Sequence, residues 1–455
     1  MRTTSEVSPA NLTQTIAAIA TATGGGIGII RISGPRAEAV LRALCPSLPR
    51  TLPTHKLVLT RARADGVDLD EVLAVVMRAP RSYTGDDVAE LHAHGGAANL
   101  QRLLDAVLAH GTRLATPGEF TRRAFTAGKL DLVQAEAVHA VIGARDERTL
   151  RAAHALRSGS LGRQVEVARR AVVSELAEIE GALDFPDEAE ESLKTLDVRA
   201  ARLRVCAASL LSRASVYRRP LGVVPEVLLI GAVNAGKSSL LNSLCGYERA
   251  LVDSAPGTTR DVVEADVDLG PGIGLVRVVD TAGLRAEAEV TPLERRGQGI
   301  ARQRRLGAAV TLLVYDGSSG FGTENEALRA SLVGSGPVLL VENKCDLPGT
   351  RVRSDVLRVS ARTGEGLDTL RDAVAAMLGE GDEEVVVASA RQAAALRLAA
   401  DAIASAAEAL DGTLAAPEVA AVELRRGLGA LGQLTGESVD EEVLDALFSR
   451  FCIGK

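Results

Sequence analysis

Aromatic residues are scarce in this sequence. It contains no tryptophan, four tyrosines and six phenylalanines among 455 residues. Hydrophobic residues still make up 46% and charged residues 24% of the chain, proportions that are typical of a folded globular protein. We therefore expect cores built from alanine, valine and leucine. The length allows about three domains of common size, each with its own core.

Paired cysteines and long apolar runs are also missing. The five cysteines are scattered, and no two form a Cys-x-x-Cys pair, which argues against a disulfide framework and against a zinc site. No apolar run reaches the roughly eighteen residues that a membrane span needs, and the first residues do not resemble a signal peptide. We expect a cytoplasmic protein without a membrane span.

The chain has no surplus of positive charge. Its formal net charge is −7 at pH 7. Proteins that hold nucleic acid chiefly through a basic surface depend on clustered lysine and arginine, so the charge argues against that class. If the protein contacts RNA, we expect a local basic patch or a partner to supply the affinity.

Three kinds of residue composition and hydrophobic spacing follow one another along the chain. Residues 12–120 mix short apolar runs, glycine-rich turns and one helical stretch, as in a small domain with strands and helices. Residues 130–215 are rich in Ala, Leu, Arg and Glu with helical spacing. From about residue 225, apolar runs alternate with amphipathic helices, which is typical of a parallel sheet covered on both faces. Residues 389–450 return to alanine-rich helix.

These changes in composition and spacing predict an α/β + α architecture. We place an α+β domain at residues 1–128, a helical domain in two halves at 129–220 and 380–455, and a mostly parallel α/β domain at 221–379, inserted between the halves. Each half alone would form a poor core. The two halves should therefore pack together.

A glycine-rich loop follows the first apolar run of the inserted domain. GAVNAGKS, residues 231–238, stands directly after EVLLI and before SLLNSL. In this strand, loop and helix pattern the backbone N–H groups face phosphates, Lys237 reaches the β and γ oxygens, and the Ser238 hydroxyl suits Mg²⁺. Taken alone, the pattern would also fit a plain glycine turn.

Three further motifs identify the nucleotide. DTAG, residues 280–283, ends the next apolar run, where Asp280 can hold the metal through water. NKCD, residues 343–346, ends another run, and Asp346 can accept two N–H groups of guanine that adenine does not offer together. SAR, residues 360–362, follows another apolar run at a position suited to supporting the guanine base. The four motifs in this order predict that the nucleotide is GTP.

The groups that would promote hydrolysis are less obvious. APGTTRD, residues 255–261, contains Thr259, a natural second hydroxyl ligand for Mg²⁺, and such a segment can act as a switch or be an ordinary loop. Leu284 stands where Ras-like proteins have a water-orienting glutamine. The acids that follow are Glu287, Glu289 and Glu294, each of which, taken singly, is more often a solvated surface charge. The Asn234 side chain could bind a monovalent cation or stabilise its turn.

Two stretches outside the inserted domain complete the pattern: PGEFTRRAFTAGKLDLVQAEAV, residues 117–138, and the closing FCIGK, residues 451–455. Together with the nucleotide motifs, they resemble the MnmE (TrmE) family of tRNA modification GTPases over essentially the whole chain. The resemblance implies a homodimer with an N-terminal domain that binds a tetrahydrofolate derivative, followed by a helical domain. It also implies a Ras-like P-loop GTPase domain inserted in the helices.

The resemblance also implies an activity and partners. Members of the family work with the flavoprotein MnmG (GidA), which carries FAD, in a heterotetramer or larger complex. Together they add a (carboxymethyl)aminomethyl group to carbon 5 of the wobble uridine of certain tRNAs. The one-carbon unit comes from a tetrahydrofolate derivative, in the 5,10-methylene or 5-formyl form. GTP hydrolysis is activated by K⁺, which brings two GTPase domains together across their switch faces.

Residue roles follow from the same resemblance. Mg²⁺ is expected on Ser238 and Thr259, and K⁺ on Asn234, Asp253, Ala255 and Thr258. Glu294 is expected to orient the attacking water, and Cys452 is a catalytic candidate whose role is open. The expected folate-binding residues are Arg31, Glu90, Lys129 and Lys455. The expected GTP-binding residues are Asn234, Ala235, Gly236, Lys237, Ser238, Ser239, Asp253, Ser254, Ala255, Pro256, Gly257, Thr258, Thr259, Asp280, Thr281, Ala282, Gly283, Asn343, Lys344, Asp346, Ser360, Ala361 and Arg362.

Two other functions remain open on the sequence. A regulatory or ribosome-associated GTPase without a modification role would explain the inserted domain, but it would leave the N-terminal domain and FCIGK without a use. A GTP-regulated folate one-carbon transferase acting without RNA would be supported by the N-terminal domain alone.

Overall fold

The computed structural model describes residues 14–185, 195–217, 223–246, 262–269, 274–281, 308–334, 336–348, 355–378, 387, 389–411 and 415–454. The chain divides into two compact units. The first comprises Met1–His139, Ala155–Tyr217 and Val386–Lys455, and the second comprises Ala140–His154 and Arg218–Val385. In the described ranges, no helix combines the length and the apolar character that a membrane crossing requires.

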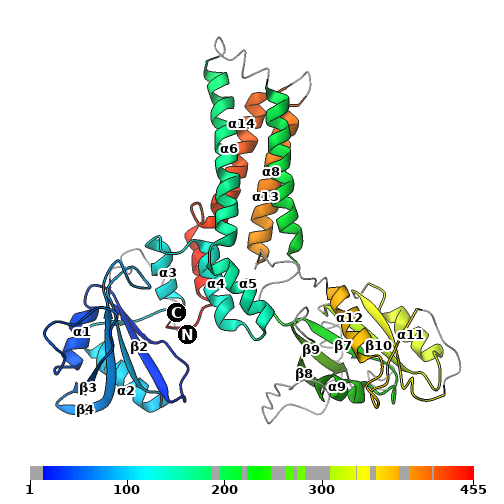
Figure 1. Cartoon of the computed structure of the whole chain (residues 1–455), viewed down its shortest axis with the longest axis horizontal. Coiled ribbons are helices and arrows are strands. Elements are labelled where there is room, and N and C mark those ends of the chain that lie inside the picture. Colours follow the sequence, from blue (N-terminus) through cyan, green and yellow to red (C-terminus); the bar gives the residue numbers. More distant parts are fainter. Residues whose placement is uncertain are drawn as a thin grey trace, which may run out of the picture. The chain divides into compact units, whose positions relative to one another are not determined.

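The first unit contains a six-stranded sheet in the order β3-β4-β5-β2-β1-β6 (Figure 1). Its neighbouring strands are antiparallel except for the parallel pair β1 and β6. Helices α1 and α2 cover one face, where leucine and isoleucine side chains form a closed core. The bounds are β1 Ile16–Ile19, β2 Ile27–Ser33, α1 Ala37–Leu44, β3 Val58–Ala64, β4 Val67–Met77, β5 Val88–His94, α2 Ala97–Ala109 and β6 Arg113–Leu114.

A bundle of long helices belongs to the same unit. Helix α13 packs against α8 and α14, and α14 packs against α6, so helices from both sides of the insertion share one core (Figure 1). Small side chains such as Ala399 and Ala406 are fully buried there, which lets the helices approach closely. The bounds are α3 Glu119–Thr126, α6 Ser160–Asp184, α8 Leu196–Val216, α13 Ala390–Ala409, α14 Pro417–Thr435 and α15 Glu441–Phe448. Two further helices, α4 Leu132–Gly143 and α5 Glu147–Arg157, are divided between the two units.

The second unit is built on a six-stranded sheet in the order β12-β11-β10-β7-β9-β8. All its pairings are parallel except that of β8 with β9. Helices α9 and α12 share a core with one face, and α11 packs on the other. The bounds are β7 Glu226–Ile230, α9 Lys237–Gly246, β8 Val262–Asp268, β9 Leu275–Thr281, β10 Val310–Asp316, α11 Thr323–Ser331, β11 Val338–Asn343, β12 Leu357–Arg358 and α12 Leu367–Leu378.

The predicted fold class is confirmed: an α+β domain, a helical domain and a doubly covered, mostly parallel sheet are all present. The parallel strands explain where the nucleotide motifs lie. Strands β7, β9, β10 and β11 point the same way, so the loops at their carboxyl ends meet at one edge of the sheet. GAVNAGKS, DTAG and NKCD each follow one of these strands.

Candidate functional site

The loop between β7 and α9 has the backbone that a phosphate site needs. Asn234 and Gly236 have positive φ values of 64° and 86°. A Cβ on Gly236 would lie 2.3 Å from the side-chain nitrogen of Asn343, so only glycine fits there. Lys237 is buried, and its ammonium donates to the carbonyls of Gly231 and Ala232 at 2.9 Å each. The lysine is thereby held against the loop that is expected to bind the phosphates.

Among the described residues, Lys237 makes no ion pair with a carboxylate. Burial lowers its pKa below the ordinary lysine value, although the charges of Asp280 and Glu324 act in the opposite direction. A buried ammonium that contacts only carbonyl oxygens gains from a nearby anion. The environment therefore suits the phosphates of a nucleotide.

A candidate metal-binding site lies beside this loop, where β9 ends. The Ser238 hydroxyl donates to Asp280 Oδ2 at 2.6 Å. Asp280 is 2% exposed, and its Oδ1 is buried without a hydrogen-bond partner in the described part of the chain. Mg²⁺ prefers oxygen ligands and keeps several waters. A buried, unpartnered carboxylate oxygen next to a hydroxyl fits such a hydrated ion.

Asn343 joins three loops of the site. Its side-chain nitrogen donates to the carbonyl of Ala235 at 3.0 Å, and its side-chain oxygen accepts from the backbone N–H of Lys344 and of Ala361 at 2.8 and 3.0 Å. The phosphate loop, NKCD and SAR are therefore fixed relative to one another. Asn343 is 1% exposed, so these bonds are shielded from water.

Lys344 makes a second bridge between the same loops. Its φ is 64°, and its ammonium donates to the carbonyl of Asn234 at 2.9 Å and to Asp316 Oδ2 at 2.6 Å. The Lys344 side chain holds the pKa of Asp316 below its usual range, against an opposing effect of burial. Asp316 ends β10, and the sequence analysis missed it. The signal was available, because acids at the carboxyl ends of neighbouring parallel strands meet.

The carboxylate of Asp346 stands where a base would be read. Ser360 donates to its Oδ1 at 2.6 Å, and Arg362 donates to its Oδ2. The hydrogen bond from Ser360 and the bond and charge of Arg362 hold the pKa of Asp346 below its usual range. Ser243 of α9, also missed by the sequence analysis, donates to the Ala361 carbonyl and so fastens SAR to the phosphate-side helix.

A second polar site lies in the first unit, at the Arg31 and Glu90 positions that β2 and β5 bring opposite each other. Arg31 Nε donates to Glu90 Oε1 at 2.8 Å, and the rings of Tyr83 and Phe120 each lie 5.8 Å from the guanidinium. Burial alone would raise the pKa of Glu90. The charges and hydrogen bonds of Arg31 and His92 outweigh it and hold the pKa below its ordinary value.

The end of the chain packs against this site. Arg31 Nη1 donates to the Gly454 carbonyl at 3.4 Å, and the Gly118 N–H donates to the Cys452 carbonyl at 3.4 Å. Gly454 has a φ of 97°, and a Cβ there would lie 2.3 Å from the carbonyl oxygen of Ile19. The last turn is therefore pressed against β1, while the Cys452 side chain is exposed.

Helix α15 is anchored by apolar and charged contacts. Phe448 and Phe451 are buried in a cluster with Leu132 and Leu444. Arg122 of α3 is buried and donates to Glu441 and Asp445 of α15. The phenylalanines thus anchor a packed helix end, as the sequence analysis expected.

Comparison with known proteins finds matches over nearly the whole chain. Residues 15–129 match the family described as GTP-binding protein TrmE N-terminus, and residues 132–452 match the MnmE helical domain. A protein of Chloroflexus aurantiacus is 42% identical over 470 residues, covering 98% of this chain and 100% of its own. One of Myxococcus xanthus is 43% identical, covering 97% and 99%. Both are named tRNA modification GTPase MnmE. The chain belongs to the MnmE family.

Some residues expected from the MnmE family lie outside the described part of the chain. They are Asp253, Ser254, Ala255, Pro256, Gly257, Thr258, Thr259, Ala282, Gly283, Glu294 and Lys455. Thr281 ends β9, and Ser239 is exposed in the first turn of α9. Lys129 donates to the Pro80 carbonyl at 2.7 Å and also packs near Gly85, so it sits against the loop that carries Tyr83. The expected roles in K⁺ binding, including that of Asn234, in the switch, in catalysis and in folate binding remain predictions.

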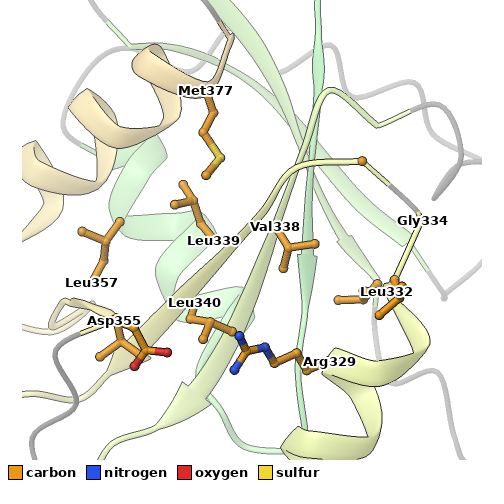
Figure 2. Close-up of a pocket in the computed structure, with 12 residues that line it drawn as sticks. Arg329, Leu332, Gly334, Val338, Leu339, Leu340, Asp355, Leu357 and Met377 are labelled. Atoms are coloured by element: carbon orange, nitrogen blue, oxygen red, sulfur yellow. The ribbon is translucent and has the colours of Figure 1, made fainter.

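A separate pocket of about 620 Å³ opens in the second unit beside α11, β11 and the end of α12. Figure 2 shows Leu332, Leu339, Leu340 and Met377 around it, with Arg329 at its edge. None of the nucleotide motifs of the MnmE family contributes to its lining. The pocket lies at the amino ends of β11 and β12, opposite the edge that carries the phosphate loop.

Proposed function

We propose that the protein is a GTP-hydrolysing subunit of a tRNA modification enzyme. With a flavoprotein of the MnmG (GidA) type that carries FAD, it would add a (carboxymethyl)aminomethyl group to carbon 5 of the wobble uridine, in the cytoplasm. The observation that carries the proposal is the double contact of Arg31. The arginine binds Glu90 within the N-terminal sheet and the carbonyl of Gly454 at the other end of the chain. A GTPase used only as a switch has no need for that second site.

The second unit supplies the nucleotide chemistry. Lys237 would bind the β- and γ-phosphates, and Asp346 would accept the two N–H groups of guanine. Ser238 and Thr259 would hold Mg²⁺ with Asp280 behind its water shell, and the ion would neutralise charge that develops on the phosphates. Glu294 would orient the attacking water. This last role rests on the family alone.

A monovalent cation site would adjoin the phosphates. Asn234 is exposed at the tip of the phosphate loop, and its side chain makes no hydrogen bond to the described residues. Its oxygen can therefore face an ion without breaking an existing contact. With Asp253, Ala255 and Thr258 it would hold K⁺, which would supply the positive charge that an arginine supplies in other GTPases.

The polar site of the first unit would bind the tetrahydrofolate derivative. Arg31 lies between two aromatic rings and beside the Glu90 carboxylate, an arrangement that suits a flat, hydrogen-bonding pterin. Lys129 and Lys455 would pair with carboxylates of the glutamate tail. The exposed Cys452 thiol stands on the segment that Arg31 holds. We propose it as a catalytic residue whose step is open.

The proposed homodimer is supported by an exposed part of the second face of the N-terminal sheet, on β3, β4 and the start of β2. Ile27, Leu59 and Leu73 are exposed there, at 68%, 66% and 37%. Arg61 and Glu71, which are cross-strand neighbours on β3 and β4, add one charge of each sign. A face with apolar residues and both charges can pair with its own copy about a two-fold axis.

The proposal is tested on the RNA product. Cells that lack this protein should lose the wobble-uridine modification, as measured by nucleoside analysis of their tRNA, and the wild-type chain should restore it. Normal modification in the deleted cells would leave a regulatory GTPase as the better account. A second assay is GTP turnover, which should be much faster in KCl than in NaCl.

A further inference from the structure

A basic stretch interrupts the otherwise acidic chain at the turn between α5 and α6. Residues 157–170 contain four arginines and one acid, Glu166, whereas the whole chain carries a net charge of −7. Arg157, Arg163 and Arg170 are exposed. We call these three residues the arginine patch. The proposed nucleotide and folate sites make no use of it.

The patch borders an open groove of about 490 Å³. The groove runs between the start of α4, the turn at Ser158 and Gly159, and the first turns of α6, and both Arg163 and Arg170 line it. Gly159 has a φ of 78°, which disfavours residues with a Cβ, and the Gln134 side chain packs 3.0 Å from the position that a Cβ would take. The walls of the groove are therefore fixed by backbone geometry.

The arginines of the groove still have donors to offer. Arg163 donates one Nη to the Ser158 carbonyl at 2.6 Å, and Arg170 donates its Nε to Glu166 at 2.8 Å. Their other guanidinium N–H groups meet no acceptor among the described residues. Glu166 also binds Arg169 Nε at 3.0 Å, so a single carboxylate orients two arginines. Each of these two guanidinium groups is therefore held by one N–H and has others available among the described residues, which suits an anion that accepts two hydrogen bonds.

The other acid of the groove is turned toward the helices. Asp131 Oδ1 accepts from the Gln134 N–H at 2.7 Å, and Gln134 Oε1 accepts from the Asp131 N–H at 2.9 Å, a capping box at the start of α4. Asp131 Oδ2 lies 2.6 Å from the position that a Cβ on Gly162 would take, in the first turn of α6. The carboxylate thus lies between two helix starts, and burial raises its pKa above the ordinary aspartate value.

The patch adjoins the polar site that holds the end of the chain. Asp131 lines the groove, and the next residue, Leu132, is buried in a cluster with Phe448 and Phe451, just before Cys452. Burial raises the pKa of the Tyr83 phenol, against the charges of Arg31 and Arg157. Tyr83 lies against Arg31, and Arg31 binds Gly454. A polymer lying along the groove would therefore pass beside the segment that carries Cys452.

We propose that the arginine patch binds the phosphodiester backbone of the tRNA substrate and leads it to the C-terminal segment. The inference rests on the proposed function. It resolves the conflict between an acidic protein and an RNA substrate, because two or three phosphate contacts give modest, salt-dependent binding without a basic surface elsewhere. Arginine matches the geometry of phosphate oxygens, and the open groove admits a continuous strand.

The test compares two double variants of the full-length protein. R163A/R170A removes the two arginines of the groove. R425A/R426A removes two exposed arginines of α14 in the same helical bundle. Binding of an unmodified tRNA transcript is measured by fluorescence anisotropy from low to high KCl. We expect R163A/R170A to bind about tenfold more weakly at low salt, with the slope of log K against log salt reduced by about 1.5, and R425A/R426A to match wild type.

Three results would overturn the inference. One is wild-type affinity and salt slope in R163A/R170A. Another is loss of flavoprotein binding with tRNA binding intact, which would make the patch a protein docking surface. The third is a wild-type chain that binds no tRNA with or without the flavoprotein. GTP turnover of each variant should equal that of wild type, because the substitutions lie in the other unit. Nucleoside analysis of deleted cells decides the proposed function separately.

Discussion

Arg362 donates two guanidinium N–H groups to one carboxylate oxygen of Asp346, from Nη2 at 2.6 Å and from Nε at 3.1 Å. Guanine presents a similar pair of neighbouring donors, its ring N–H and its exocyclic amine. The side chain of Arg362 is 75% exposed, whereas that of Asp346 is 10% exposed, so the arginine is the partner that can move away. If Asp346 binds guanine as proposed, Arg362 would compete with the base for this carboxylate.

Replacing this arginine should favour nucleotide binding. An ion pair with an exposed arginine is weak, so Arg362→Ala should raise the affinity for GDP by at most about fivefold, with faster association. Stopped-flow fluorescence with a labelled GDP measures both. Arg329→Ala, which removes an exposed arginine of α11 in the same unit, serves as the control. Weaker binding by Arg362→Ala would mean that the arginine supports the base rather than competing with it.

The cation proposal leads to a prediction at Asn234. Asn234→Ala should remove the difference between GTP turnover in KCl and in NaCl, because the side-chain oxygen is the ligand that the loop contributes. Asparagine also tolerates the positive φ of 64° better than alanine does. Asn234→Gly therefore provides a control that relieves the backbone while still lacking the oxygen. Retention of the KCl preference by Asn234→Gly would show that the side chain does not bind the ion.

The sequence predicted which motifs meet at the edge of the second sheet, because each motif ends an apolar run. In a parallel sheet the ends of such runs meet at one edge, so local patterns were enough to bring Lys237, Asp280 and Asn343 together. The contact of Lys344 with Asp316 was missed. Its two residues end different strands, and a side chain that bridges two motifs leaves no local pattern.

The polar site of the first unit was beyond reach of local patterns. Arg31 and Glu90 are 59 positions apart and meet through strand register, while Gly454 reaches Arg31 across 423 positions. No periodicity encodes a contact of that kind. Family resemblance named Arg31 and Glu90, but the contact of Arg31 with the tail could be found only from the fold.

The pair of Arg31 and Glu90 should make the stability of the N-terminal sheet depend on pH. The folded pKa of Glu90 lies below its ordinary value. Its contribution is therefore complete above the unfolded pKa of about 4.3 and is lost as the pH falls through the folded pKa. Glu90→Gln should lower the free energy of opening of β2 and β5 by about 1–3 kcal/mol at pH 7, since it leaves Arg31 with a weaker partner. The difference from wild type should shrink below about pH 4.

Hydrogen exchange of the β2 and β5 amides measures this local free energy in a chain of several domains. Glu71→Gln is the matched control, because Glu71 lies on the same sheet with a side chain that is 57% exposed and 3.8 Å from Arg61. Glu71→Gln should change neither the free energy of opening at pH 7 nor its dependence on pH. A Glu90→Gln difference that persisted unchanged at low pH would assign the effect to packing rather than to charge.

Gly454 should be indispensable for tRNA modification although it carries no side chain. Its φ of 97° disfavours any other residue, and a Cβ would meet the Ile19 carbonyl at 2.3 Å, so Gly454→Ala must push the tail off β1. Displacing a reacting group by about 1 Å can cost on the order of a hundredfold in rate. We expect Gly454→Ala to lower modification at least tenfold, by that estimate, with GTP turnover unchanged.

The control for Gly454→Ala is Gly429→Ala, because a Cβ at that α14 position meets nothing within 4 Å. It should preserve modification. Cys452→Ser separates placement from chemistry, since it keeps the backbone and removes the thiol. If Cys452→Ser retained activity while Gly454→Ala lost it, the tail would act by position, through the contacts of Arg31 and Gly118. If Cys452→Ser lost activity as well, the thiol itself would be required. Full activity of Gly454→Ala would contradict any role for the fastened tail, because the close contact with Ile19 leaves the altered chain no way to keep its place.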